Sequence, residues 1–274
     1  MNFQIEEIDF SQLTLPNKLY KYRTWQNPNH KKVITHKEVF FAPYRSFNSK
    51  YEHLIEDDYN SIDEEKVWQQ IYDDAPKLFD IHEHDKRVKH ANKFVEEKNW
   101  NKPEIQTEAS KKFQDRLNNE FGALCMSEVK DNYTLWSDFT GFSIGLNPAF
   151  MFEKGQIQCT SGYVNYYPED SPPKTKVFTY SKIERAAEVN KVIFNLPFRY
   201  KDEKEYRLSK YIVNTGRSFP IKEQTVEEIN IGAKMNQKNK SELIAAANNN
   251  YPNSKIYEQK LNDRDEIIGY EQIN

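Results

Sequence analysis

Two glutamates and one arginine stand at alternate positions at the start of an extended segment, as Glu203, Glu205 and Arg207. Because side chains in a strand alternate between its faces, we expect these charged groups on one face, with Tyr206 and Leu208 on the other. Two neighbouring carboxylates can act as an acid and a base or stabilise a developing positive charge, and an arginine can orient one of them. A solvated edge strand with a Glu–Arg ladder, which performs no chemistry, would show the same pattern.

Polar side chains also flank a large aromatic ring in the middle of the chain. Residues 123–126 form an apolar run that is typical of a buried strand, and residues 142–146 resume a strand pattern. Ser127 ends the first of these strands, while Trp136 and Ser137 belong to a predicted helical turn that an Asp-Asn pair can cap. The arrangement suits the wall of a ligand site, and it equally suits a packed corner of the core.

The pattern of the whole chain predicts the scaffold that must position these groups. A strand near the N-terminus ends in Arg23, helical spacing follows, with Pro103 opening the last helix, and a strand, helix, strand unit occupies the C-terminal third. We therefore predict one α+β domain over residues 1–274. Its central sheet should be mixed and mostly antiparallel, with a helical insertion at about residues 60–121.

Composition limits the kinds of partner. The net charge is −3 and the pI is about 6.1, so no general footprint for nucleic acid is expected. Neither GxGxxG nor GxxxxGK[ST] occurs, which argues against the usual nucleotide cradles. The chain has only two cysteines and no long apolar run, so we expect a reducing, cytoplasmic location and no membrane association.

A histidine group is the strongest candidate for a metal site. His82, His84 and His90 lie in the segment IHEHDKRVKH, but their spacing does not place two ligands on one helical turn. The segment therefore favours an exposed polar helix start, and no metal is predicted.

The chain resembles a widespread, uncharacterised bacterial domain family over about residues 18–270. Members of that family open with an LYKYR strand and carry an FNDPFE loop, a CFSE…N…MWSHYA…H.G block and a later E.E.R strand. The matching residues here are Leu19 to Arg23, Phe47-Asn48 with Tyr51-Glu52, Leu124 to Glu128, Asp131-Asn132, Trp136-Ser137, and Glu203, Glu205 and Arg207.

The chain departs from that family pattern at two places. Its loop reads Asn-Ser-Lys-Tyr-Glu where the family has Asn-Asp-Pro-Phe-Glu, and the His-x-Gly after the tryptophan block is missing. The resemblance implies no activity by itself. It implies that Asn48, Tyr51 and Glu52 of the loop, together with Arg207, contact a substrate.

A second, more distant resemblance does imply an activity. A strand arginine, then a serine that ends a strand, then Glu-x-Glu at a later strand is similar to the order found in ADP-ribosyltransferases. Arg23, Ser127, Glu203 and Glu205 follow this order here, with Ser137 as an equal candidate for the serine. The resemblance implies NAD as a co-substrate and an unknown acceptor, which is a protein, a nucleic acid or a small molecule. A role in a bacterial defence or toxin system would fit.

The chemistry of NAD cleavage assigns a role to each residue in that order. Breaking the nicotinamide–ribose bond passes through an oxocarbenium-like ribose, so a carboxylate near the 2′-hydroxyl stabilises the charge. The resemblance gives this place to Glu205, the orientation of the acceptor to Glu203, and the diphosphate to Arg23. The other implied contacts are a hydrogen bond from Ser127 on the nicotinamide side and a stacked ring from Tyr22 or Trp136.

Two further hypotheses compete with the transferase. The first is a non-enzymatic ligand- or protein-binding module of the same family, in which the aromatic loop and Trp136 form a pocket without turnover. The second is a metal-dependent nuclease that uses Asp202 with the two glutamates, but the expected Asp…Glu-x-Lys arrangement is absent from the sequence. A transferase requires Glu205 and Arg23 to converge on one cleft, whereas a binding module does not.

Overall fold

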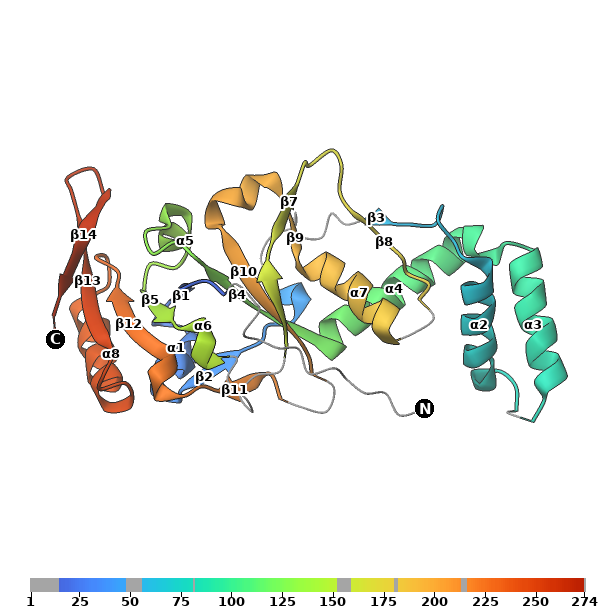
Figure 1. Cartoon of the computed structure of the whole chain (residues 1–274), viewed down its shortest axis with the longest axis horizontal. Helices are drawn as coiled ribbons and strands as arrows, with labels where there is room; N and C mark the ends of the chain where they lie inside the picture. Colours follow the sequence, from blue (N-terminus) through green and yellow to red (C-terminus); the bar gives the residue numbers. More distant parts are fainter. Residues whose placement is uncertain are drawn as a thin grey trace.

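A mixed sheet of eight strands forms the centre of the molecule, in the order β14-β13-β12-β5-β1-β4-β10-β6 (Figure 1). The computed structural model describes residues 15–47, 56–80, 82–151, 159–179, 182–212 and 216–273. The strands of the sheet are β1 (Leu19–Arg23), β4 (Phe121–Ser127), β5 (Phe142–Leu146), β6 (Thr160–Tyr163), β10 (Glu205–Tyr211), β12 (Val226–Ile231), β13 (Lys255–Leu261) and β14 (Ile267–Gln272).

Most neighbours in this sheet run antiparallel, and β12 and β13 are parallel because α8 (Gln237–Asn250) crosses over between them. The predicted α+β class, with a mixed and mostly antiparallel sheet, is therefore confirmed. Three short pairs complete the strands: β2 (Glu38–Phe40) with β11 (Ser218–Pro220), β3 (Glu56–Asp57) with β8 (Lys174–Thr175), and β7 (Asn165–Tyr167) with β9 (Asn195–Pro197).

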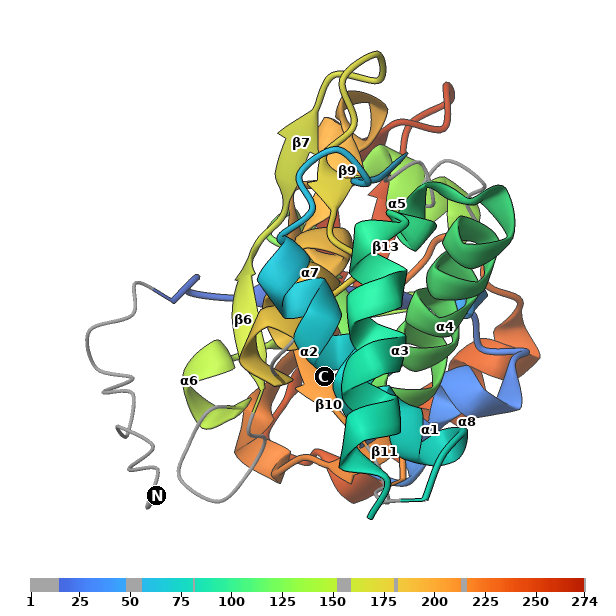
Figure 2. The ribbon, with the colours of Figure 1, turned by 90° about the vertical axis from the view of Figure 1, so that its right-hand side faces the viewer.

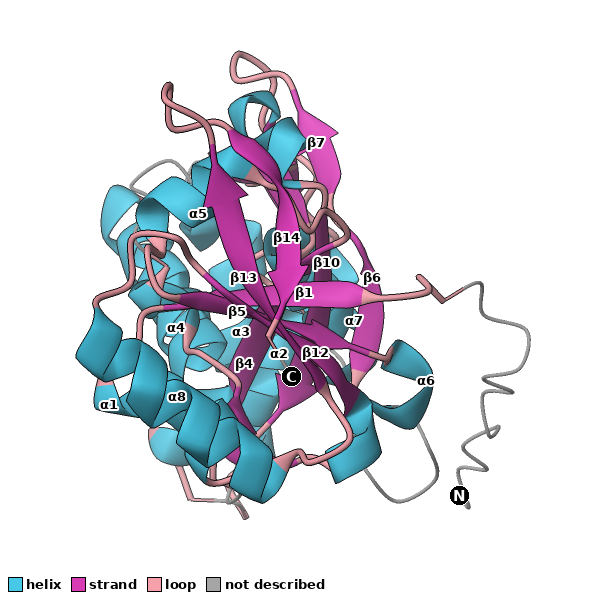
Figure 3. Ribbon diagram, turned by 90° about the vertical axis from the view of Figure 1, so that its left-hand side faces the viewer, coloured by secondary structure: helices cyan, strands magenta, loops and turns pink. Residues whose placement is uncertain are grey.

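Helices α1 (Pro28–Thr35) and α8 pack side by side on one face of the sheet (Figure 3). Their apolar side chains, among them Ile34 and Leu243, join the alternate residues Leu19, Ile144 and Ile229 of the strands in one buried cluster. Each such side chain contributes about 1.5–3 kcal/mol through burial. The apolar residues at alternate positions of the strands thus form the face of the sheet that packs against the helices.

The predicted helical insertion contains α2 (Glu64–Asp74), α3 (His84–Glu96) and α4 (Pro103–Glu120), which lie between β3 and β4 in the chain. These helices extend to one end of the molecule, opposite β13 and β14 (Figures 1 and 2). Helix α7 (Lys182–Ile193) packs with α4 around a second buried cluster that includes Phe113, Leu117 and Val189.

Short helices complete the fold. The α-helical ones are α5 (Tyr133–Asp138) and α6 (Pro148–Met151). The 3-10 turns are η2 (Tyr44–Ser46), η3 (Ala75–Lys77), η4 (Asn99–Asn101), η5 (Phe198–Glu203) and η6 (Glu223–Thr225). Within the described residues, no helix combines the length and apolar character needed to cross a membrane.

The sheet opens between β1 and β4. These two strands pair only at Tyr20 and Ser127, whereas β1 pairs with β5 along its whole length and β4 does the same with β10. Toward the start of β4, Ala42 takes the place beside Ala123, with two backbone hydrogen bonds of 2.9 Å. Since β1 leaves β4 after Tyr20, its later residues no longer pair with β4, and this divergence of the two strands is the opening referred to below.

Candidate functional site

Lys21 occupies the opening between β1 and β4. Its Nζ donates a hydrogen bond to the backbone oxygen of Cys125, a carbonyl of the diverging strand β4. Burial first, and then the positive charges of Arg23 and Arg207, lower the pKa of Lys21 to about 7, while Cys125 and Glu205 act in the opposite direction. The ammonium group is therefore within electrostatic reach of the charged groups on both sides of the opening.

Arg23 extends this positive region on the β1 side, and the His30 ring lies within electrostatic reach of it. Burial lowers the pKa of Arg23 to about 10, so its guanidinium keeps its charge at neutral pH. Burial also lowers the pKa of His30 to about 4, with Arg23 and Lys21 as further causes. The imidazole is therefore neutral, and its Nδ1 accepts a hydrogen bond of 3.2 Å from the backbone N–H of Thr24.

Glu205 and Arg207 form a buried ion pair on the other side of the opening. One carboxylate oxygen of Glu205 accepts from Nε of Arg207 at 2.7 Å and lies 2.6 Å from its second guanidinium nitrogen. Arg207 has no exposed surface, and its remaining guanidinium nitrogen donates to the backbone oxygen of Ile193 at 2.7 Å. Strand β10 lies between β4 and β6, so the interpretation of this segment as a solvated edge strand is wrong.

Glu203 does not share the strand face of Glu205. It ends the 3-10 turn η5, and Lys204 then adopts a left-handed φ of 44°, so the extended segment begins only at Glu205. The predicted common face of three charged residues is therefore wrong for Glu203. Its carboxylate nevertheless lies near that of Glu205. Burial raises the pKa of the Tyr166 phenol to about 12, and the negative charges of both glutamates contribute to this rise.

Ser127 is fully buried and its hydroxyl is already engaged. Its Oγ donates to the backbone oxygen of Glu203 at 2.6 Å and accepts from the backbone N–H of Val129 at 3.0 Å. The first bond joins the end of β4 to the turn that precedes β10, and the second fixes the chain just after β4. Ser127 thus supports the backbone around Glu205, and Ser137, the alternative serine, lies exposed on α5.

Strand pairing decides which predicted residues share a face. Tyr20, Ser127 and Glu205 form one row across β1, β4 and β10, so their side chains point to the same side. Arg23 lies three positions beyond Tyr20 and belongs to the opposite face. The opening separates the two groups, and Lys21 is coupled electrostatically to both Arg23 and Glu205. Arg23 and Glu205 therefore lie on opposite faces of the sheet, so strand register does not bring them into the one cleft that a transferase requires.

Tyr22 and Trp136 pack against each other in an edge-to-face contact, with ring centroids 5.2 Å apart. The Tyr22 hydroxyl lies 2.7 Å from the backbone oxygen of Lys130, and Nε1 of Trp136 donates to the same oxygen at 3.0 Å. Both rings are more than nine-tenths buried. The predicted stacking of Tyr22 on a ligand would require its ring to leave this contact.

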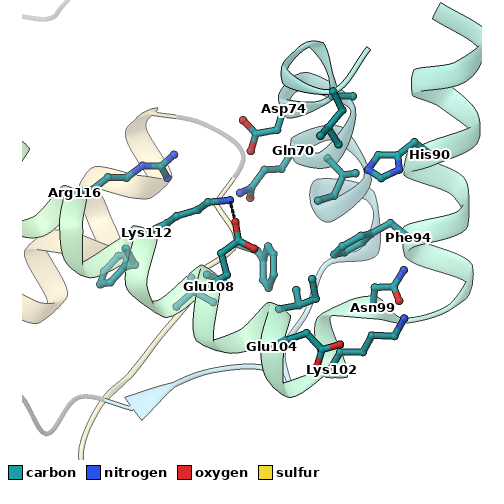
Figure 4. Close-up of a pocket in the computed structure, with 18 residues that line it drawn as sticks. Gln70, Asp74, His90, Phe94, Asn99, Lys102, Glu104, Glu108, Lys112 and Arg116 are labelled. Carbon is teal, nitrogen blue, oxygen red and sulfur yellow. Dashed lines mark ion pairs between the residues drawn. The ribbon is translucent and has the colours of Figure 1, made fainter.

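A cavity of about 590 Å³ lies in the helical insertion (Figure 4). Its walls come from α2, α3 and α4, and charged side chains, including the ion-paired Glu108 and Lys112 at 2.7 Å, surround its apolar residues. A smaller cavity, about 140 Å³, lies beside Trp136 and Ser137. The remaining predicted site residues line neither cavity, apart from Asn48, Tyr51 and Glu52, which lie outside the described residues.

The histidines of the insertion make protein contacts. Nδ1 of His84 lies 2.8 Å from the hydroxyl of Tyr72, and the ring of His90 packs edge-on against Phe79. Across the part of the chain that the structure describes, no three histidine, cysteine or acidic side chains come together as a metal site.

Sequence reasoning missed the two side chains that define the opening, Lys21 and His30. A signal for Lys21 was present, since it shares a strand face with Arg23, and two cations on one face of a strand are unusual in a core. No comparable signal marked His30, because its place depends on how α1 returns to the end of β1.

Comparisons with known protein families, with curated proteins and with solved structures found no match for this chain. The family and transferase resemblances drawn from its motifs stay predictions.

Proposed function

We propose that this protein binds a phosphate-bearing ligand, with NAD as the first candidate, at the opening between β1 and β4. The observation that carries the proposal is the charge at this opening. Lys21, Arg23 and Arg207 supply three cationic groups, and Glu205 is the carboxylate coupled to Lys21 among them. An excess of positive charge in a partly buried site favours an anion, and a diphosphate suits two cations, Lys21 and Arg23, that stand two positions apart on one face of β1.

The low pKa of Lys21 supports the same proposal. Its ammonium form is destabilised by burial and by neighbouring cations, and a bound anion would reverse part of this cost. Arg23 would then contact one phosphate group and Lys21 the other. These roles extend the predicted function of Arg23 to its neighbour on the same strand face.

Transfer of the ADP-ribosyl group is a second candidate function. The electrostatic coupling of Glu205 to Lys21 favours it, and the position of Arg23 on the opposite face of the sheet counts against it. In this reaction the bond from ribose C1′ to the nicotinamide nitrogen breaks, and the electron pair leaves with nicotinamide. The oxocarbenium carbon then forms a bond to the acceptor, whose proton passes to solvent. The Glu205 carboxylate would stabilise the positive ribose, with Arg207 fixing its orientation through one oxygen.

Binding without turnover is the alternative, and two contacts favour it. The charge of Glu205 is partly neutralised by Arg207, and the hydroxyl of Ser127 is committed to the backbone. A protein with these features would act as a sensor that passes ligand binding to a partner.

The test measures nicotinamide release from NAD by the wild type, by Glu205→Gln, and by Glu169→Gln as a matched control, with a bacterial lysate as the source of acceptors. Glu169 also pairs with an arginine, Arg199, but on the surface. A transferase releases nicotinamide with the wild type and the control, and loses about 100-fold or more in rate with Glu205→Gln, as for removal of one charge-stabilising group. Equal rates of release for wild type and Glu205→Gln would contradict the role of Glu205, and no release by the wild type would contradict catalysis and leave the binding function.

A further inference from the structure

We infer that the cavity between α5 and the strands β13 and β14 is a second binding site, which takes a single planar heteroaromatic ring of nucleobase size. This cavity is independent of the opening between β1 and β4. Its volume of about 140 Å³ is well below the roughly 300–1,000 Å³ of sites for drug-sized ligands. One ring, and not a whole dinucleotide, therefore matches the space.

The walls of the cavity offer contacts suited to a flat ring. The side chain of Trp136 lines one part, and Leu261 and Ile267 supply apolar surface from the two strands. The Trp136 ring is fixed by Tyr22, which packs edge-to-face against it with the ring centroids 5.2 Å apart. A Cβ atom on Gly232 would lie only 3.1 Å from the Trp136 ring, so glycine at this position leaves room for the indole.

Gln259 gives the cavity a polar group that protein contacts leave unused. This glutamine lies in the cavity wall and is 6% exposed. Its Oε1 accepts a hydrogen bond of 3.2 Å from the backbone N–H of Ala233, which assigns the amide orientation. Its Nε2 is buried and makes no hydrogen bond. Buried amide donors are nearly always paired, so an acceptor atom on a bound ring would complete this group.

The mouth of the cavity carries an exposed aromatic side chain. Tyr133 begins α5, one turn before Trp136, and is 70% exposed although it lines the same cavity. Large aromatic rings exposed beside a hollow are a feature of binding surfaces, since they offer a stacking face. The ion pair of Lys234 and Asp265, 2.9 Å apart, lies at the same rim and would favour the polar edge of a heterocycle.

The test uses adenine and uracil as probes, with binding followed by saturation-transfer NMR of the free bases in the presence of the whole protein. We expect saturable binding of at least one base to the wild type. Gln259→Leu, which removes the donor, and Leu261→Trp, which fills the cavity, should each weaken it at least tenfold. Glu205→Gln should bind the base as the wild type does, because it changes only the other site.

Two results would overturn this second site. One is the absence of saturable binding of both bases to the wild type. The other is unchanged binding in Gln259→Leu and Leu261→Trp, with melting temperatures that show both variants to be folded. Because nicotinamide release and NAD binding are measured separately, failure of this site leaves the proposal for the opening between β1 and β4 intact.

Discussion

At the scale of single residues, the pKa of Lys21 is strongly changed by burial and by neighbouring charges. Its ammonium lies among cations in a partly buried opening, and one carboxylate, Glu205, opposes them. A lysine with a pKa near 7 changes its charge around neutral pH, in contrast to an exposed lysine with a pKa near 10.4. Ligand binding, stability and pH are therefore linked at this position.

The first prediction concerns the pH dependence of stability. The folded-state pKa of Lys21 is lowered to about 7 from 10.5, so above pH 7 the unfolded chain binds more protons than the folded one at this residue. The contribution of Lys21 to the free energy of unfolding should therefore rise from pH 7 to pH 9. Urea melts at these pH values should show a steeper rise for the wild type than for Lys21→Met. Identical slopes would contradict the lowered pKa.

The matched control for that measurement is Lys260→Met. Lys260 is partly exposed and pairs with Glu271 at 2.7 Å, which raises its pKa. Its removal should leave the slope between pH 7 and pH 9 as in the wild type.

The second prediction concerns the buried ion pair. Arg207→Met leaves the Glu205 carboxylate without its main partner, and breaking a buried pair in this way costs about 3–5 kcal/mol. The loss should appear as a lower midpoint in urea unfolding. The double variant Glu205→Leu with Arg207→Met should recover part of this stability, since it leaves no unpaired charge. Simple additivity of the two single effects would count against the pairing.

The missed burial of this pair has a physical reason. Alternating charges in a strand normally indicate a solvated face, because few charged side chains are fully buried. Here Arg207 is satisfied by Glu205, two positions earlier in the same strand, and by the Ile193 carbonyl, a contact that comes from tertiary structure. The contact with Ile193 cannot be predicted from the local sequence, because it joins residues 14 positions apart.

At the scale of elements, the starts of two helices were predicted well because a local signal marked them. Asn132 caps α5 as expected, by accepting from the backbone N–H of Leu135 at 3.0 Å, and Pro103 opens α4. Glu203 was placed on a strand because its period-two spacing continues the pattern of Glu205. The turn at Lys204, where φ is positive, interrupts that pattern. Glycine is the residue that usually indicates a positive φ, and this turn has a lysine instead.

The third prediction tests how β1 and β5 are joined. A Cβ atom on Gly141 would lie 2.5 Å from the backbone oxygen of Arg23 and 2.9 Å from the backbone nitrogen of Trp25. Gly141→Ala must therefore displace the end of β1, and we expect a loss of about 1–3 kcal/mol. Thermal and urea melts measure it. Gly216→Ala is the control, since nothing lies within 4 Å of its added Cβ.

A second consequence of Gly141→Ala would appear at the site. The end of β1 carries Arg23, so its displacement should weaken anion binding as well as stability. Wild-type binding in a variant that has lost stability would mean that the end of β1 does not take part in the site.

At the scale of the whole molecule, the opening arises from the order of strands. Residues from β1 near the N-terminus, from β4 in the middle of the chain and from β10 far along it meet there, with β1 between β5 and β4 and β10 beyond β4. The α+β class and the helical insertion follow from periodicity, but this order does not, because it depends on contacts between segments far apart in the sequence. The same holds for the cavity beside Trp136, which needs α5 and the hairpin of β13 and β14 together.

The two ends of the molecule also differ in character. Helices α2, α3 and α4 carry the larger cavity at one end, and β13 and β14 border the smaller one at the other (Figures 1 and 4). The opening between β1 and β4 lies in the sheet between them. A ligand there would contact the element that joins the two halves of the sheet.

Titration of NAD into the purified protein by isothermal calorimetry tests the central claim most directly, with inorganic pyrophosphate as a competitor. We predict saturable binding to the wild type and to Lys260→Met, competition by pyrophosphate, and at least tenfold weaker binding to Lys21→Met and to Arg23→Met. Absence of binding to the wild type, or equal affinity for folded Lys21→Met and Arg23→Met, would contradict an anion site at the opening between β1 and β4.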